Sequence, residues 1–181
     1  MSRRTGLVAA LAVIGAVAVG FLALVGVAGA KKNDSNGNRM LGFNEAPAVS
    51  APGARGTIEV RITNNRTAID FTLTWQNLSG PPGAAHIHLG QKNVSGGIVA
   101  FLCGGGGQPP CAAATSGMAT GTITAANIQP LPSQGIAGPT DFGEVLTAIR
   151  AGVTYANIHT ALLPSGEIRG QIKARGGGDD D

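Results

Sequence analysis

Residues 57–76, TIEVRITNNRTAIDFTLTWQ, decide the fold class. Over residues 57–63 and again over residues 69–75, apolar and polar side chains alternate. Successive side chains of a strand point to opposite faces, so each segment is predicted to be a strand with one apolar face. Asn64 and Asn65 between them tolerate the positive φ that a tight turn requires. The stretch is therefore predicted to form a β-hairpin.

Five further strands and one helix are expected after the hairpin. The helix is predicted over residues 142–149, where apolar side chains recur at helical spacing, with Asp141 as N-cap, Glu144 completing a capping box and Gly152 at the end. Short strands bounded by turn residues favour a single all-β sandwich or barrel, in which the helix is a crossover that closes one end. The five strands are expected at residues 85–89, 98–102, 118–124, 153–159 and 167–173.

The composition excludes several classes of protein. Of the 181 residues, 29 are glycine, 13% are charged and 4% are aromatic, a profile unlike that of a coiled coil or a charged disordered chain. Without Arg3 and Arg4, eleven basic side chains face ten acidic ones, and the net charge falls from +3 to +1. A chain this close to neutrality has no basic stripe for phosphates, so we expect no nucleic-acid partner.

The amino terminus has the pattern of an export segment. Arg3 and Arg4 precede the uncharged apolar run of residues 7–30, which ends in the small-x-small pattern AGA that a signal peptidase requires. The run is also long enough to span a bilayer, so residues 1–30 are predicted to be a signal peptide or an uncleaved membrane anchor. Either interpretation places the folded part outside the cytoplasm, in the periplasm, on the cell surface or in the extracellular space. Contact with a membrane is expected only through residues 7–30.

The rest of the chain divides into three parts by composition. Residues 31–40 (KKNDSNGNRM) are polar and have no period, which is typical of a linker. Residues 41–175 are expected to form one domain of ordinary size. Residues 176–181 (GGGDDD) are predicted to be a disordered acidic tail.

The only two cysteines of the chain, Cys103 and Cys111, are separated by a stretch of four glycines, one glutamine and two prolines. This stretch is flexible at one end and turned at the other, so a disulfide between them is one interpretation, and it agrees with export. The other is a metal or redox pair, although seven intervening residues match neither Cys-x-x-Cys nor a zinc knuckle.

All three histidines lie in related contexts. His86 and His88 belong to AHIH (residues 85–88), and His159 ends the similar ANIH (residues 156–159). Because the side-chain period of a strand is two, His86 and His88 point to the same face, and the repeated pattern brings His159 toward them. Three neutral imidazoles fixed by strands suit copper or zinc, and no other cofactor is indicated.

A structural interpretation of the histidines stands beside the metal site. The isoleucine of each motif is expected to face the core, which leaves the histidines on the opposite face, where they would hydrogen-bond neighbouring strands. Glu167 has two interpretations as well. It is a weaker candidate for a metal ligand or general base near His159, or it is a cross-strand polar partner on the same face as Arg169.

Four motifs together resemble the CHRD domain, a module named from chordin and common in secreted bacterial proteins. They are LGFNEAPAV (residues 41–49), AHIHLG (85–90), YANIHT (155–160) and PSGEIRGQ (164–171). The resemblance covers residues 41–173 and implies a single extracellular, immunoglobulin-like β-sandwich without an established enzymatic activity. Chordin's cysteine-rich, ligand-binding modules have no counterpart in this chain, so their partner is not carried over.

A weaker similarity is to the copper-zinc superoxide dismutase fold, which also has a His-x-His strand in an exported β-sandwich with a short disulfide. Three histidines are too few for the ligand set of that enzyme, so dismutase activity is not expected. Two hypotheses follow from the sequence. The first is an exported, non-catalytic binding or structural module of the cell envelope or matrix, with an extracellular protein or matrix partner. The alternative is a copper- or zinc-binding domain that uses His86, His88 and His159, with redox or hydrolytic chemistry at an open position.

Overall fold

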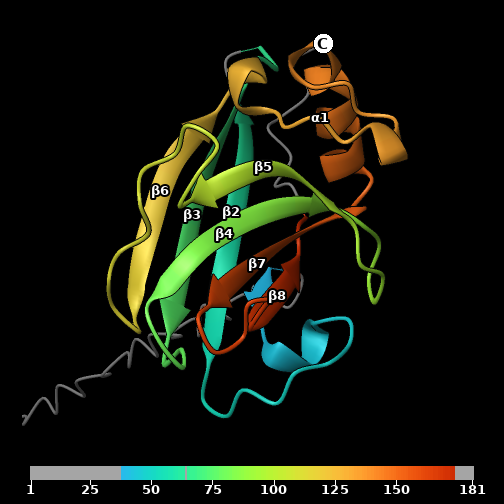
Figure 1. Ribbon diagram of the computed structural model, residues 1–181. Helices are drawn as coiled ribbons and strands as arrows, with labels where there is room; N and C mark the ends of the chain where they lie inside the picture. Colours follow the sequence, from blue (N-terminus) through green and yellow to red (C-terminus); the bar gives the residue numbers. More distant parts are fainter. Residues whose placement is uncertain (1–37, 64, 174–181) are drawn as a thin grey trace, which may run out of the picture. The chain divides into compact units, whose positions relative to one another are not determined.

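The computed structural model describes residues 38–63 and 65–173. The predicted export segment at residues 1–30 and the acidic tail at residues 176–181 lie outside these residues. The described part folds as two four-stranded antiparallel sheets and one short α-helix (Figure 1). The prediction of an all-β sandwich is therefore confirmed.

The first sheet contains the predicted hairpin and has the strand order β1-β2-β3-β6. Its strands are β1 (Arg39–Met40), β2 (Arg55–Thr63), β3 (Ala68–Gln76) and β6 (Gly117–Ile123). Apolar partners such as Ile58 and Leu73 face each other across β2 and β3 and are fully buried. Asn65 adopts the positive φ, 51°, that the turn prediction required.

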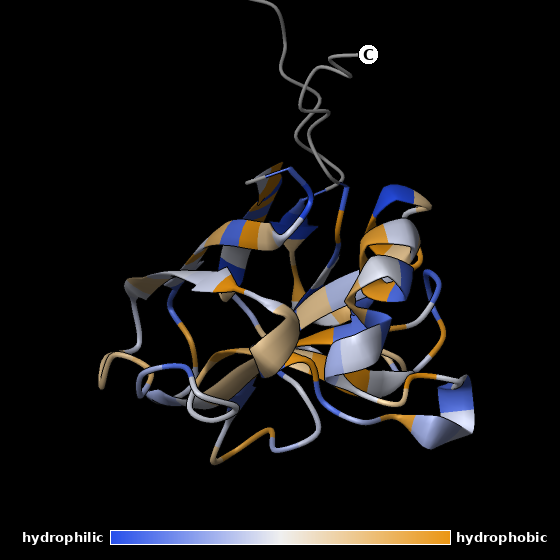
Figure 2. Cartoon of the chain, turned by 90° about the horizontal axis from the view of Figure 1, so that it is seen from above, coloured by the Kyte–Doolittle hydropathy of each residue, from blue (hydrophilic) through white to orange (hydrophobic). Residues whose placement is uncertain are grey.

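The second sheet has the order β5-β4-β7-β8. Its strands are β4 (Pro82–Leu89), β5 (Gly97–Cys103), β7 (Thr154–Thr160) and β8 (Ile168–Gln171). Hydrophilic and hydrophobic residues alternate along β2 and β3, whereas β5 has no charged or amide side chain (Figure 2). The apolar side chains of the two sheets form one core, which includes Trp75, Ile87 and Ile158. All seven predicted strands exist, with ends shifted by a few residues.

The helix α1 (Phe142–Arg150) connects β6 of the first sheet to β7 of the second and lies at one end of them (Figure 1). Its apolar side chains are buried as the helical spacing predicted, and Gly152 follows it with φ 69°. The predicted capping box is wrong. A 3-10 turn (Pro139–Asp141) precedes the helix, and the Asp141 carboxylate accepts a hydrogen bond from the backbone N–H of Ala137 instead of capping α1.

Strand β1 lies within the predicted linker. Met40 is fully buried, and Leu41 exchanges two backbone hydrogen bonds with Arg169 of the second sheet. The segment therefore touches both sheets, and the fold includes residues 38–40 in addition to the described part of the predicted domain, residues 41–175. Two paired residues are too few to show a period, so the sequence pattern contained no signal for this strand.

Three further 3-10 turns complete the described part. They are η2 (Gly42–Asn44), η3 (Ala125–Asn127) and η4 (Pro132–Gln134). The segment around η2 begins where β1 ends, and it lies next to β8. The residue after η2 is Glu45. Its side chain lies beside Gly166, in the connection between β7 and β8, and interacts with Arg169 of β8 and Asn157 of β7.

Candidate metal centre

His86 and His88 lie on β4, with Ile87 between them. Ile87 is buried in the core, so the period of two turns both imidazoles to the outer face of the second sheet. Each histidine nevertheless has only 7% of its surface exposed. The connection between β4 and β5 covers this face, because the carbonyl of Gly96 lies on His88 and the hydroxyl of Ser95 donates to the carbonyl of Ala46.

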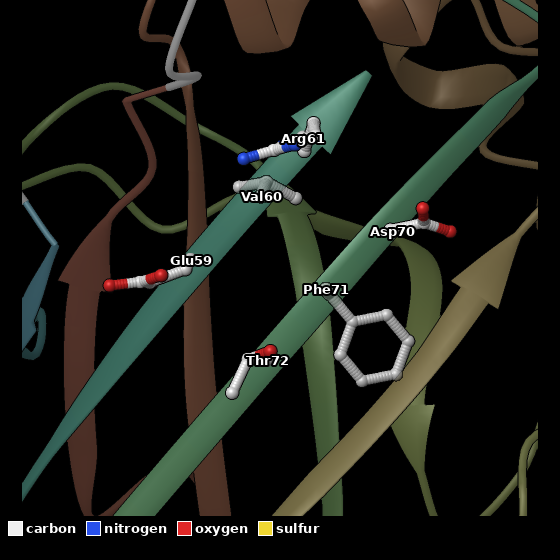
Figure 3. A pocket seen from close by; sticks show the side chains of 6 residues that line it. All are labelled: Glu59, Val60, Arg61, Asp70, Phe71 and Thr72. Carbon is white, nitrogen blue, oxygen red and sulfur yellow. The ribbon is translucent and has the colours of Figure 1, made fainter. Parts of the chain in front are cut away.

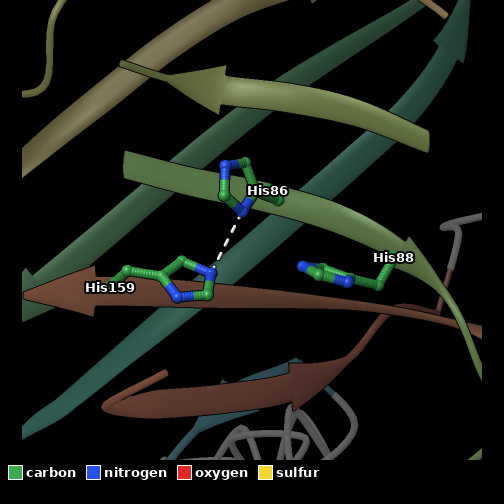
Figure 4. Close-up of side chains that lie close together, drawn as sticks. All are labelled: His86, His88 and His159. Atoms are coloured by element: carbon green, nitrogen blue, oxygen red, sulfur yellow. Dashed lines mark hydrogen bonds between the residues drawn. The ribbon is translucent and has the colours of Figure 1, made fainter. Parts of the chain in front are cut away.

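His159 lies on β7, which pairs with β4, and it joins the other two histidines (Figure 4). One ring nitrogen from each residue lies within 4.8 Å of the others. The ring centroids of His86 and His159 are 4.7 Å apart, and those of His86 and His88 are 5.5 Å apart. The convergence predicted from the repeated motif is thus present in the structure.

Hydrogen bonds to backbone carbonyls fix the tautomers of two rings. Nδ1 of His88 lies 2.9 Å from the oxygen of Gly96, and Nδ1 of His159 lies 2.9 Å from the oxygen of Pro164. A carbonyl only accepts, so each Nδ1 carries the proton and each Nε2 has a free electron pair. His86 Nδ1 lies 3.0 Å from His159 Nε2 and must therefore donate to it.

Burial keeps all three imidazoles neutral. It lowers the pKa of His86 to about 3, with His159 and His88 adding to the shift. It lowers the pKa of His88 to about 4, against an opposing contribution from the carbonyl of Gly96. Burial also lowers the pKa of His159, against an opposing contribution from the carbonyl of Pro164. Neutral imidazole is the form that binds metals, and here it needs no proton release at neutral pH.

Nε2 of His88 is buried and has no hydrogen-bond partner. Buried polar atoms without partners are uncommon and call for an explanation such as an ion or a water molecule. The ring itself is held firmly, because it stacks on Tyr155 with centroids 4.7 Å apart and planes 9° apart. The guanidinium of Arg169 lies 3.4 Å from the centre of the Tyr155 ring, on which it forms a cation–π contact.

Asn157 and Glu45 adjoin the cluster. Asn157 is 2% exposed, and its Oδ1 lies 2.9 Å from Nε2 of His159. Burial raises the pKa of Glu45 to about 7, while Arg169 and the amide of Asn157 lower it by smaller amounts. The amide thus influences the Glu45 carboxyl, but Oε1 of Glu45 is buried without a hydrogen-bond partner.

Glu167 and Arg169 have different partners, so the structure does not pair them. The carboxylate of Glu167 accepts hydrogen bonds from the N–H and hydroxyl of Ser79 and from the hydroxyl of Thr160. The structure does not bring Glu167 to the three histidines. Nη2 of Arg169 donates to the carbonyls of Gln91 and Val94, which are 2.8 and 2.9 Å away.

Cys103 and Cys111 form a disulfide, with an S–S distance of 2.01 Å. They are therefore not free to bind a metal. The loop that they close lies on Phe101, because a Cβ added to Gly105 or Gly106 would come within 2.6 Å of the Phe101 ring. The Phe101 ring also lies nearly perpendicular to the ring of His86, at a centroid distance of 4.4 Å. The disulfide loop thus supports one member of the cluster.

Apart from the histidine cluster, the first sheet has a hollow along β2 and β3 (Figure 3). It has a volume of about 310 Å³, and Glu59, Arg61 and Asp70 are among its lining residues. Asp70 accepts hydrogen bonds from the hydroxyls of Thr63 and Thr122. These groups form an ordinary polar face of a sheet, so the histidine cluster is the stronger candidate.

Two residues beside the histidines, Asn157 and Glu45, lie within the sequence motifs, but the motifs did not indicate that they adjoin the site. Asn157 occupies, in the second motif, the place of His86 in the first, and it pairs with His86 across β4 and β7. Glu45 lies within LGFNEAPAV, in a segment that has no period and so gives no direction for a side chain. Its approach to Asn157 depends on contacts between distant parts of the chain.

Comparison with known proteins identifies one family. No curated protein and no solved structure matches the chain significantly. Among residues 38–63 and 65–173, no helix is long and apolar enough to cross a membrane. The profile of the CHRD domain matches residues 39–172, the whole of the sandwich from β1 to the end of β8. The chain therefore belongs to the CHRD-domain family.

Proposed function

We propose that this CHRD-domain protein is an exported module that binds one copper or zinc ion through His86, His88 and His159. One observation carries the proposal. Three neutral imidazoles present ring nitrogens within 4.8 Å of one another. Two of them are held by backbone carbonyls so that their protons lie on Nδ1 and each Nε2 has an electron pair that can bind a metal. This second set of contacts is what usually orients histidine ligands of a metal.

The arrangement is close to what an ion requires. Metal–nitrogen bonds of 2.0–2.1 Å place the nitrogens of a tetrahedral site about 3.3 Å apart. His86 Nδ1 and His159 Nε2 are already 3.0 Å apart and share one proton. An ion would replace that proton, which moves to Nε2 of His86, and the approach of His88 would give its buried Nε2 the partner that it lacks.

Export is supported by the sequence and by the disulfide. The basic residues and apolar run before residue 31 have the composition of a signal peptide or membrane anchor. A structural disulfide persists in oxidising compartments and is rare in the cytosol. We therefore propose that the domain works in the periplasm, at the cell surface or in the extracellular space.

A second candidate is the same exported module without a metal, which would bind a protein or matrix partner. Large apolar side chains are exposed in three connections of the chain, namely Phe43 (76%), Val94 (51%) and Leu162 (72%). Exposed apolar groups of this kind are used in contacts between proteins. In this candidate the histidines are a polar cluster that only joins β4 to β7.

Elemental analysis separates the two candidates. The full chain is expressed with its own N-terminal segment, purified without a His tag after growth with copper or zinc, and analysed for bound metal. We expect close to one ion per chain, lost in His88→Ala and His159→Ala but kept in Thr120→Ala, an exposed control on β6. Absence of metal from the folded wild-type chain at every supplementation would leave only the second candidate.

A further inference from the structure

We propose that Asn157 supplies the fourth donor, its amide oxygen, to the ion held by His86, His88 and His159, and that Glu45 keeps this amide in the required orientation. This inference rests on the proposed function and extends it to the class of ion and of chemistry. A site closed by four protein donors holds its ion without an open position for a substrate. The module would then carry a structural or electron-transfer ion rather than perform hydrolysis.

The first argument is a conflict between electron pairs. Nδ1 of His159 donates to the carbonyl of Pro164, so Nε2 of this neutral ring has an electron pair and no proton. Oδ1 of Asn157 lies 2.9 Å from that Nε2 and also carries only electron pairs. Two acceptors at this distance repel each other, and in the metal-free chain the proton that Nδ1 of His86 donates to Nε2 of His159 offsets this repulsion. An ion that displaces that proton would lie beside both electron pairs and take over its role.

The second argument concerns the direction of the amide. Rotation by 180° would remove the conflict by turning Nδ2 toward His159, but Nδ2 lies on the side of Glu45. Both Nδ2 and Oε1 of Glu45 come within 2.9 Å of the position that a Cβ of Gly166 would occupy. Once deprotonated, above its pKa of about 7, the Glu45 carboxylate favours an N–H group at this place and would disfavour an oxygen. Glu45 therefore keeps Oδ1 on the side of the histidines.

The third argument is the position of the amide relative to the other ligands. Asn157 lies opposite His86 in the pairing of β4 with β7 and two residues before His159, so all three share one face. The amide also acts on His88, whose pKa it raises against the larger effect of burial. Asn157 thus lies close to all three imidazoles, and a single ion among them would be within reach of Oδ1.

The donor set selects the class of ion. Three imidazole nitrogens suit copper and zinc, and an amide oxygen is a hard, neutral donor that favours the divalent forms over Cu(I). The four donors carry no charge. The Glu45 carboxylate, which interacts with the amide of Asn157, would compensate part of the charge of the ion. We therefore expect Zn²⁺ or Cu²⁺ in a four-coordinate N3O site.

Cobalt substitution tests the proposal on the full chain, because the visible absorption of Co²⁺ reports its coordination number. We expect wild-type protein to bind one Co²⁺ with the intense bands of a four-coordinate ion. Asn157→Leu should bind it at least about tenfold more weakly, with altered bands. Asn157→Asp keeps the oxygen and adds charge, so it should keep the four-coordinate bands and bind more tightly. Gln129→Leu is the matched amide control, because its side-chain contact is outside the cluster.

Further measurements keep the inference falsifiable. Azide should leave the Cu²⁺ spectrum of the wild type unchanged, and it should bind in Asn157→Ala, where the fourth position becomes free. If folded Asn157→Leu binds Co²⁺ with wild-type affinity and bands, the inference is overturned while the three-histidine site stands. If Asn157→Leu does not fold, a Co²⁺ affinity of Asn157→Asp equal to that of the wild type overturns it equally. A wild-type chain that binds no Co²⁺, Zn²⁺ or Cu²⁺ overturns both proposals.

Discussion

At the scale of single residues, Glu167 shows how burial separates a structural role from a chemical one. It is 1% exposed, and three hydrogen bonds from Ser79 and Thr160 converge on its carboxylate. Such contacts stabilise the fold because the buried carboxylate and the buried hydroxyl of Thr160 would otherwise lack partners. Its position next to β8 fixes the connection between β7 and β8, beside which His159 lies.

Replacement of Glu167 tests this role. In Glu167→Ala, the donors of Ser79 and Thr160 lose their acceptor, and we expect a loss of about 2–4 kcal/mol in the free energy of unfolding. The change Glu144→Ala, at an exposed position of α1, should change it by less than about 0.5 kcal/mol. Urea denaturation measures both. The metal content of folded Glu167→Ala should equal that of the wild type, and a selective loss of metal at unchanged stability would make Glu167 a ligand instead.

Glu45 predicts a pH dependence of stability in the metal-free protein. Its pKa is about 7 in the folded chain, against an ordinary value of 4.5, because of burial. The folded state therefore holds this proton more tightly than the unfolded state. The resulting stabilisation is complete below pH 4.5, and it is lost as the pH rises through 7. The three histidines, whose pKa values are lowered, act in the opposite direction.

Comparison with Glu45→Gln isolates the contribution of this carboxyl. Between pH 5 and 8 in the presence of a chelator, the wild type should lose about 1–2 kcal/mol of stability relative to Glu45→Gln. The histidine contributions are common to both proteins and cancel. Denaturation series at each pH provide the measurement, and parallel curves for the two proteins would show that Glu45 titrates normally.

At the scale of elements, the disulfide loop between β5 and β6 contributes to the stability of the fold and supports the histidine cluster. It encloses Gly105 and Gly106, which lie against Phe101, and Phe101 lies against His86. We expect the double change Cys103→Ser and Cys111→Ser to lower the free energy of unfolding by about 2–3 kcal/mol, the value for so short a loop. Denaturation with and without a reductant measures the effect. A wild type that is insensitive to reduction would show that packing alone holds the loop.

The elements also show what the sequence pattern can and cannot predict. The strands β2 and β3 follow from alternation, because a period of two over seven residues is unambiguous. The convergence of the histidines follows from the repeated motif once both copies are strands. The position of Glu45 and the missing cap at Asp141 could not be predicted. Each residue lies in or next to a turn, and the sequence of a turn has no periodicity from which the direction of a side chain could be inferred.

At the scale of the whole molecule, the first residues of the described part connect the two sheets. Asn38 accepts a hydrogen bond from the N–H of Ile58 and one from the N–H of Lys173, and Met40 is fully buried. A chain of residues 34–181 should therefore fold, whereas a chain of residues 42–181 should be less stable by about 2–5 kcal/mol through the loss of Met40 alone. Thermal unfolding of both measures this difference. Equal stability of the two chains would show that the residues before 42 do not contribute to the fold, in agreement with the domain boundary predicted near residue 41.

The central claim is that the three histidines of this CHRD domain hold one metal ion. Its most direct test is the metal content of the untagged, exported full chain after growth with copper or zinc, determined by elemental analysis. The account predicts close to one ion per chain, and almost none in His88→Ala protein that is still folded. A folded wild-type chain that contains no copper or zinc at any supplementation would contradict the claim.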